Sequence, residues 1–366
     1  MSRAKHSDYM EWAKLHSHAR FNLATSGLIS VTREEFDFHG ELEITRAGDY
    51  GYRPLQERLA EHAGVSPECI VAADGTSMAN HLAMAAVLEP GDEVLVEEPS
   101  YVLLLELASF LGARIKRFQR KAENGFAIDL DEIQAQLTPQ TRLIVLTNLH
   151  NPSGALISRE TLSALGEIAL RAKTRVLVDE VYLEMLFDDE MPGAFSIGQT
   201  FTDRDENPFM TTNSLTKAYG LSGLRCGWII ASPELARRIW RLNDLFSANS
   251  AHPAEQLSVS ALEQLPRFRA RAQTLLKTNR PLLNQFLDSR PELDCFRPCA
   301  GTVIFPRLLQ GDAEELVRLL REKFETSVVP GNFFEKPQHF RIGIGGETAN
   351  VQGGLERLGK ALDALS

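Results

Sequence analysis

Short hydrophobic runs alternate with amphipathic segments along most of the chain from residue 68 onward. The runs predict strands at 69–74, 92–101, 113–120, 142–149, 175–182, 208–214 and 225–231. The segments between them repeat apolar residues at helical spacing and predict helices at 77–88, 102–112, 129–137, 159–173 and 235–246. Short strands that alternate with helices of this length are typical of βα units. The pattern therefore predicts an α/β fold with a mainly parallel seven-stranded sheet flanked by helices.

The pattern changes in the last third of the chain. Residues 254–289 have helical spacing throughout, with Pro266 and Pro281 as expected helix starts or breaks. Beyond them the texture becomes α+β, and a last helix is predicted at 351–365. At 366 residues the chain is long enough for about two domains. We therefore expect a large domain at 40–270 and a smaller α+β domain at 271–366, to which residues 1–39 contribute as an N-terminal arm.

Composition narrows the class of protein. Hydrophobic residues make up 43% and charged residues 24%, which is typical of a globular protein. The net charge of −10 argues against a nucleic-acid or anionic membrane surface as partner. No apolar run approaches the roughly 20 residues that span a bilayer, and the N-terminus lacks a signal-peptide core. We expect neither nucleic acid nor membrane as a partner.

The cysteines give little chemistry. The chain has four of them, at Cys69, Cys226, Cys295 and Cys299, and none forms a C-x-x-C pair. Thiols in a reducing cytoplasm are the simplest interpretation. Cys295 and Cys299 have no neighbouring ligands in the sequence that would complete a metal site. We therefore expect a cytoplasmic protein without a bound metal.

Polar and aromatic residues stand where the predicted strands end. Ligands of open α/β sheets bind in the crevice beyond the carboxyl ends of the strands. Each of these groups alone also fits a turn or a helix cap. Five strand ends with such groups at one edge of one sheet instead favour a ligand site. The groups are Gly75, Thr76 and Ser77 after the first strand, Tyr101 after the second, Asn151 after the fourth, Asp179 and Tyr182 in the fifth, and Ser214 and Lys217 after the sixth.

The ordered set resembles the class I/II aminotransferases, which are pyridoxal-phosphate enzymes of fold type I. The resemblance covers nearly the whole chain. The motifs that carry it are Ser-x-x-Lys and Gly-x-Arg at Ser214, Lys217, Gly223 and Arg225, Asn-Pro-x-Gly at 151–154, Asp-x-x-Tyr at Asp179 and Tyr182, Pro-x-aromatic at Pro99 and Tyr101, and Gly-Thr-Ser at 75–77. The resemblance implies pyridoxal 5′-phosphate as cofactor, and an amino acid and a 2-oxo acid as substrates.

The family's chemistry implies a role for each residue type. Lys217 would bind the cofactor aldehyde, because only lysine supplies an amine from a side chain, and would then act as the base at the substrate Cα. Asp179 would hold the proton on the pyridine nitrogen. Asn151 and Tyr182 would bind the ring oxygen, and Tyr101 would stack on the ring. The phosphate would lie against Gly75, Thr76, Ser77, Ser214 and Arg225.

Two further residues are implied to bind the substrate. Arg341 in "HFRIGIG" matches the family's arginine for the α-carboxylate, and the fork of a guanidinium suits two carboxylate oxygens. Gly27 ends a loop at 23–27 that resembles the family's N-terminal substrate loop. Relatives also carry a tyrosine that reaches the phosphate of a neighbouring subunit. Here the alignment places Arg46 there, with Tyr50 nearby, and either could make the contact in the expected homodimer.

Other pyridoxal-phosphate reactions stay open at this point. A lyase, a decarboxylase or a cyclase would use Lys217, Asp179 and Arg225 equally well. Arg341 argues against simple decarboxylation, because a carboxylate that leaves must be free of such a grip. A cofactor-sensing regulator is a different class. Such relatives carry a basic DNA-binding domain at the N-terminus, whereas this chain is acidic and has about 40 residues before its main pattern. The sequence favours transamination.

Overall fold

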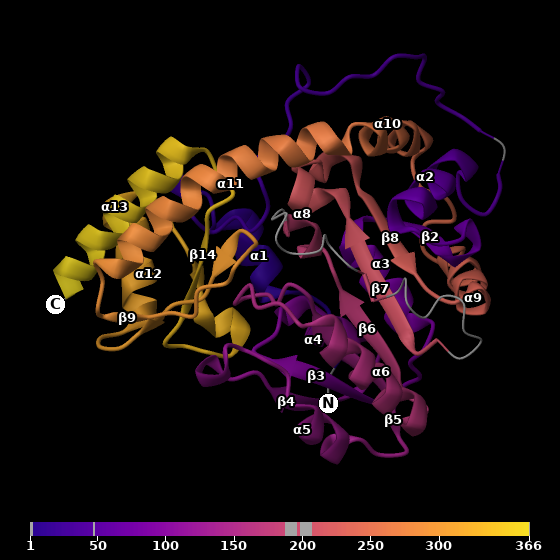
Figure 1. The fold of residues 1–366 in the computed structure, drawn as a ribbon, viewed down its shortest axis with the longest axis horizontal. Coiled ribbons are helices and arrows are strands. Elements are labelled where there is room, and N and C mark those ends of the chain that lie inside the picture. The colour runs from indigo at the N-terminus through magenta and orange to yellow at the C-terminus, as the bar shows by residue number, and fades with distance from the viewer. Residues whose placement is uncertain (1–2, 47, 187–195, 198–206, 366) are drawn as a thin grey trace.

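The structure is a computed structural model that describes residues 3–46, 48–186, 196–197 and 207–365. Its centre is a seven-stranded sheet with the strand order β2-β8-β7-β6-β5-β3-β4 (Figure 1). The strands are β2 (Ile70–Asp74), β3 (Glu93–Glu98), β4 (Arg114–Gln119), β5 (Thr141–Thr147), β6 (Arg175–Asp179), β7 (Phe209–Ser214) and β8 (Cys226–Ile230). The predicted α/β class and the seven strands are confirmed.

Strand direction brings the polar groups to one edge of the sheet. Strands β3 to β7 are parallel to one another, and β8 is antiparallel to both β2 and β7. Because two reversals cancel, β2 runs in the same direction as β7. The carboxyl ends of β2, β3, β5, β6 and β7 therefore lie at the same edge, and β8 alone runs the other way.

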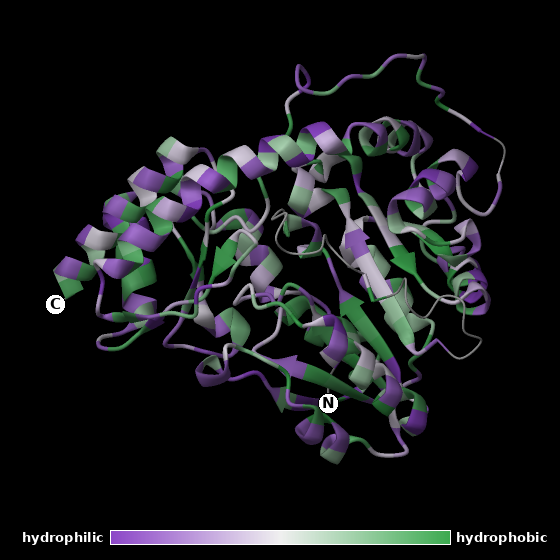
Figure 2. Ribbon diagram, viewed as in Figure 1, coloured by the Kyte–Doolittle hydropathy of each residue, from purple (hydrophilic) through white to green (hydrophobic). Residues whose placement is uncertain are grey.

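Helices cover both faces of this sheet. They are α2 (Arg53–Ala63), α3 (Gly75–Ala85), α4 (Val102–Phe110), α5 (Leu130–Gln136), α6 (Arg159–Ala172), α8 (Leu215–Tyr219) and α9 (Pro233–Asn243). Successive strand residues point to opposite faces. Val94 and Val96 accordingly pack in the cluster with α3, α4 and α9, whereas Leu95 packs in the cluster with α5 and α6. Figure 2 shows the hydrophobic strands between helices whose outer faces are polar.

The rest of the chain forms three small sheets and four longer helices. The helices are α10 (His252–Glu263), α11 (Leu265–Asp288), α12 (Ala313–Phe324) and α13 (Thr348–Leu365). The strands are β9 (Leu293–Asp294), β10 (Val303–Ile304), β11 (Arg307–Leu308), β12 (Thr326–Ser327), β13 (Val329–Pro330) and β14 (Phe340–Gly343). They pair as β10-β14-β13, β11-β9 and β12 with the N-terminal β1 (Phe21–Asn22). Within the part of the chain that the structure describes, no helix is long and apolar enough to cross a membrane.

Helix α11 departs from the predicted break at Pro281. Pro266 stands in the first turn of α11, where a proline is tolerated, but Pro281 lies inside the helix, which continues to Asp288. The buried residues Leu276 and Leu283 lie on either side of it. Packing of this face against the core outweighs the lost backbone hydrogen bond, so the predicted break at Pro281 is wrong.

The N-terminal arm runs between the C-terminal part and the sheet. After α1 (Asp8–Leu15), the backbone of Leu23 bonds to Ser327 and Gly343, and the N–H of Ile29 donates to the carbonyl of Gly345 at 2.8 Å. The N–H of Leu28 donates to the carbonyl of Lys217 at 2.9 Å. The arm therefore carries residues 26–28 to α8, where Lys217 stands.

Candidate active site

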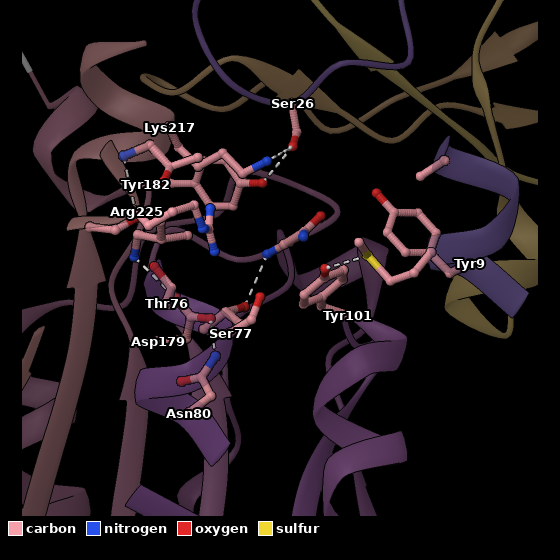
Figure 3. A pocket seen from close by; sticks show the side chains of 17 residues that line it. Tyr9, Ser26, Thr76, Ser77, Asn80, Tyr101, Asp179, Tyr182, Lys217 and Arg225 are labelled. Atoms are coloured by element: carbon pink, nitrogen blue, oxygen red, sulfur yellow. Dashed lines mark hydrogen bonds between the residues drawn. The ribbon is translucent and has the colours of Figure 1, made fainter. Parts of the chain in front are cut away.

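A cavity of about 260 Å³ opens at the carboxyl edge of the sheet (Figure 3). The predicted site residues that line it are Thr76, Ser77, Tyr101, Asn151, Asp179, Tyr182, Ser214, Lys217 and Arg225. The other predicted residues adjoin this lining. Gly75 lies against Arg225, Gly27 against Lys217, and Arg341 against Asn151. The structure thus places around one cavity the residues predicted to bind the cofactor and the substrate within one chain, whereas Arg46 and Tyr50 lie elsewhere.

The first turn of α3 forms one end of the cavity. Gly75 has φ +77°, and a Cβ there would come within 2.3 Å of the Arg225 guanidinium. Only glycine fits such a left-handed and crowded position. The N–H groups at the start of a helix lack partners within the helix and attract anions. The Thr76 hydroxyl is buried and has no hydrogen-bond partner among the described residues.

Arg225 and Ser214 complete this end of the cavity. A guanidinium nitrogen of Arg225 donates to the carbonyl of Asp74 at 3.0 Å, just before α3. The Ser214 hydroxyl accepts from the N–H of Thr216 at 3.3 Å and so caps α8. A helix N-terminus, a guanidinium and two hydroxyls together favour a doubly charged phosphate.

Asp179 ends β6 in the floor of the cavity. One of its carboxylate oxygens accepts from the Asn80 amide at 2.8 Å, and the other accepts from the N–H of Val181 at 3.1 Å. Burial raises the pKa of Asp179 to about 6, although Asn80, the N–H of Val181 and Lys217 each act to lower it. A buried carboxylate with this raised pKa favours a cationic partner that carries a proton, such as a pyridinium.

Lys217 stands in α8, a helix of five residues between β7 and the 3₁₀ turn η4 (Ser222–Leu224). Its Nζ donates to the hydroxyl of Ser26 at 3.2 Å, and the Tyr182 hydroxyl donates to the same oxygen at 2.8 Å. A Cβ on Gly27 would lie 3.2 Å from the Cδ of Lys217. The amine of Lys217 is therefore directed across the cavity toward the N-terminal arm.

Arg341 is buried beside the cavity, with 1% of its surface exposed. Its guanidinium donates to Asn151 Oδ1 at 2.8 Å, to the carbonyl of Ala24 at 3.1 Å and to the Tyr9 hydroxyl at 3.3 Å. Its Nε has no partner among the described residues. Burial alone would raise the pKa of Tyr9, but Arg341 and Lys217 outweigh burial and lower it.

Several lining residues were not found from the sequence. Asn80 is a buried polar residue among the apolar residues of α3, next to the buried His81, and this pair of polar residues was the available signal. Tyr9 and Met10 come from α1, and Ser26 precedes Gly27 in the arm. The first 40 residues follow neither predicted periodicity, so only the resemblance of the loop 23–27 pointed to the cavity, and nothing in the sequence singled out Tyr9, Met10 or Ser26.

Neither Arg46 nor Tyr50 lines this cavity in its own chain. Arg46 Nε donates to Glu255 at 3.0 Å, and the Tyr50 hydroxyl donates to Asp244 at 3.1 Å. Glu255 itself borders a second cavity that Arg225 also lines. Arg46 is therefore bonded to Glu255, which lines a second cavity together with Arg225.

The cavity fits pyridoxal phosphate on three separate features of this chain. The unpartnered Thr76 hydroxyl and the crowded glycine at 75 form a cradle for phosphate. Asp179 offers a buried carboxylate for the ring nitrogen. Lys217 offers the amine that an aldehyde requires.

Comparison with known proteins gives the same answer. The model of the family described as "Aminotransferase class I and II" matches residues 23–358. The arginine–pyruvate transaminase of Pseudomonas aeruginosa is 31% identical over 80% of this chain and 76% of its own length. The capreomycidine synthase of Streptomyces vinaceus is 30% identical over 94% of this chain and 90% of its own. A pyridoxal-phosphate-dependent aminotransferase structure from Streptococcus suis superposes with a TM-score of 0.90, at 27% identity and over 98% of both chains.

The chain belongs to the class I and II aminotransferase family. It is a pyridoxal-phosphate-dependent aminotransferase, and it exchanges an amino group between an amino acid and a 2-oxo acid.

Proposed function

We propose that Lys217 binds the cofactor and acts as the base at the substrate Cα. The observation that carries this assignment is the placement of its amine in the cavity together with Asp179 and Tyr182. When bound, pyridoxal phosphate supplies an electron-withdrawing ring that stabilises negative charge at the substrate Cα. Lys217 would take the proton from that carbon and deliver it to the cofactor carbon on the other side of the amino nitrogen.

In this proposal the other residues hold the cofactor and orient its ring. Gly75, Thr76, Ser77, Ser214 and Arg225 bind the phosphate, since they form the anion cradle at α3. The remaining residues bind the ring: Asp179 holds a proton at its nitrogen, Asn151 and Tyr182 bind its oxygen, and Tyr101 packs on its face. Tyr101 approaches Tyr9 edge-on at 5.5 Å between ring centroids, which limits movement of its ring.

Arg341 is the proposed partner of the substrate α-carboxylate, with Gly27 leaving room beside Lys217. The support is a buried guanidinium with an unpartnered Nε close to Asn151. Among the described lining residues, the other cations are Lys217 and Arg225, which serve the cofactor. The described lining of one chain therefore offers no further cation for a second carboxylate, and we propose a donor whose side chain carries no negative charge.

The second candidate function is a cyclase, which the same residues would also suit. The observation that favours it is the likeness in fold to a structure described as a PLP-dependent cyclase, with a TM-score of 0.88 over the whole chain at 22% identity. A cyclase and an aminotransferase share the steps at Lys217 and Asp179 and differ in where the amino group ends. Release of a 2-oxo acid distinguishes transamination from ring closure.

We also propose a cytoplasmic homodimer built from two domains. The proposed boundary at 270/271 lies inside α11, with residues 40–270 as the cofactor domain and residues 271–366 plus 1–39 as the small domain. The support for a dimer is the exposure of large apolar side chains, among which Ile44 is 84% exposed and Leu245 is 78% exposed. Exposed apolar patches of this kind are typical of protein interfaces.

Two measurements test the assignment. Borohydride reduction of the enzyme with its cofactor, followed by peptide mapping, should find a pyridoxyl group on Lys217, and a group on another lysine would refute the assignment. Each amino acid is then mixed with the enzyme and its product analysed. A matching 2-oxo acid supports transamination, whereas a cyclic amino acid without any 2-oxo acid supports the cyclase.

A further inference from the structure

The hydroxyl of Ser26 forms hydrogen bonds with two side chains of the cavity, those of Tyr182 and Lys217. Its oxygen accepts a hydrogen bond from the Tyr182 hydroxyl at 2.8 Å and another from Lys217 Nζ at 3.2 Å (Figure 3). Ser26 is buried, with 5% of its surface exposed, and it lines the cavity. It lies 191 residues from Lys217 in the sequence.

The backbone fixes this hydroxyl in place. The Thr302 hydroxyl donates to the carbonyl of Ser26 at 2.5 Å. One residue further on, Gly27 packs against the Lys217 side chain, and the N–H of Leu28 donates to the carbonyl of Lys217 at 2.9 Å. The arm and α8 are thus joined at the backbone, so Ser26 meets Lys217 at a set distance rather than by a chance rotamer.

We propose that Ser26 is a positioning residue that holds the free amine of Lys217 and orients the Tyr182 hydroxyl during the reaction. The proposal rests on the roles assigned above to Lys217 and Tyr182, and it adds a residue from the arm to them. Ser26 does not exchange a proton with the substrate.

The hydrogen-bond capacity of serine suits this task. A hydroxyl has two acceptor lone pairs and one donor hydrogen, so it can accept from Lys217 and at the same time donate to Tyr182. When Tyr182 donates to the ring oxygen of the cofactor, its own oxygen becomes free to accept from Ser26. A bond of this kind strengthens the Tyr182 donor, because linked hydrogen bonds polarise one another.

The lysine side chain gives the physical need for such a partner. Four rotatable bonds leave a free lysine amine many positions, and a base works only within hydrogen-bond reach of its proton. Ser26 restricts the amine to one side of the cavity. The other ionisable groups that face Lys217 are Asp179 and Tyr9, and both also interact with it electrostatically.

Three variants of Ser26 test the proposal. Ser26→Ala removes the hydroxyl, Ser26→Cys keeps the size with a much weaker hydrogen-bonding group, and Ser26→Thr keeps the hydroxyl. We expect kcat to fall about ten- to a hundredfold in the first two, as for the loss of a hydrogen bond to a charged group. Ser26→Thr should stay within about fivefold of wild type, and KM should change little in all three. Ser30→Ala is the control, because that hydroxyl lies in the same arm, outside the loop at 23–27, and is exposed.

Readouts other than turnover separate positioning from a structural role. Cofactor affinity, the melting temperature and borohydride labelling of Lys217 should stay unchanged in Ser26→Ala. Two other quantities should change: the deuterium isotope effect with Cα-deuterated amino acid should rise, and the pH midpoint of the bound cofactor's absorbance should move to higher pH. The midpoint moves because Tyr182 loses the donor that strengthens it.

The outcomes are distinguishable. Wild-type isotope effect, kcat and absorbance midpoint in Ser26→Ala would overturn the proposal, and so would equal losses in Ser26→Thr and Ser26→Ala, because size would then matter rather than the hydroxyl. If Ser26→Ala fails to fold, Ser26→Cys decides on the same readouts. A pyridoxyl group on another lysine in the wild-type enzyme would refute the Lys217 assignment itself, and this proposal with it.

Discussion

Replacement of the buried residue Arg341 should separate substrate binding from cofactor binding. Arg341→Lys keeps the charge but loses the fork, and Arg341→Ala loses both, so both should be impaired. We expect kcat/KM for the best amino-acid donor to fall about ten- to several-hundredfold, because one partner of a desolvated pair is lost. The absorbance and affinity of the cofactor should hardly change, since other residues hold it.

Steady-state kinetics measures this effect. Arg318→Ala is a suitable control, because that side chain is 59% exposed on α12 and does not line the cavity. Near-normal kcat/KM in both Arg341 variants would mean that the α-carboxylate binds elsewhere.

Asp179 makes the stability of the cofactor-free protein depend on pH. Burial raises its pKa to about 6 from an ordinary value near 3.8. A carboxyl whose folded-state pKa is raised contributes stability below the unfolded pKa, and this contribution is lost as pH rises through the folded pKa. Asp179→Asn removes the titration. The free energy of unfolding of wild type relative to this variant should therefore drop by about 1 to 2 kcal/mol between about pH 5 and 7.5.

Denaturant unfolding of the two cofactor-free proteins across this range provides the measurement. Glu180 is present in both proteins, and its titration largely cancels in the difference, because burial is the main cause that raises its pKa to about 8 and the charge of Asp179 is the smallest cause. A difference that does not vary with pH would contradict the raised pKa of Asp179.

Helix α1 covers Arg341 and shields its guanidinium from water. Tyr9 accepts from Arg341 and approaches Phe333 at 5.4 Å between ring centroids, while Met10 and Ala13 line the cavity. Without the helix, water reaches the guanidinium and screens its attraction for a carboxylate. Deletion of residues 1–16 should therefore raise KM for the amino acid by about tenfold or more, with cofactor affinity unchanged.

Tyr9→Ala serves as the milder variant and should raise KM in the same direction. A truncated enzyme with wild-type KM would show that α1 is not part of the substrate site. Loss of the cofactor would instead show that α1 supports the sheet edge.

Elements with a clear period were predictable from the sequence, and irregular ones were not. The strands and helices between residues 69 and 246 follow because each buries a regular face. Two details escaped for local reasons. Pro281 stays inside α11 because packing outweighs its broken bond, and Lys217 stands in α8, a helix of five residues that is too short to show a period.

At the scale of the whole molecule, long-range contacts were the part that the sequence left open. Motifs such as Gly75-Thr76-Ser77 act locally at a strand end, so their gathering at one edge follows from the parallel sheet. Ser26 and Tyr9 reach the cavity only because the arm pairs with β12 and β14 and then with α8. No periodicity in the sequence encodes such pairings between distant segments.

Residues 42–50 and 245–246 leave apolar side chains exposed, namely Leu42, Ile44, Tyr50, Leu245 and Phe246. Two hydrogen bonds hold the first segment against the second and against α10, because the Tyr50 hydroxyl donates to Asp244 and the N–H of Glu43 donates to Gln256. Burial of these side chains in a second copy would remove them from water, which is favourable by roughly 25 cal/mol for each Å² buried. The side chains therefore support a dimer whose contact borders the region of Arg46 and Arg225.

Charge in place of two of these side chains should dissociate the dimer. Ile44→Asp combined with Leu245→Asp places two carboxylates in the contact, where burial without a partner is costly. Sedimentation at micromolar concentration should show a dimer for wild type and a monomer for the double variant, and the monomer should retain cofactor more weakly if a partner's arm supports the phosphate region. Leu309→Asp, at an apolar residue that is 51% exposed in the C-terminal part, is the control and should remain dimeric. A wild-type monomer with full cofactor affinity and activity would contradict the dimer, because the arm would then have no partner site to complete.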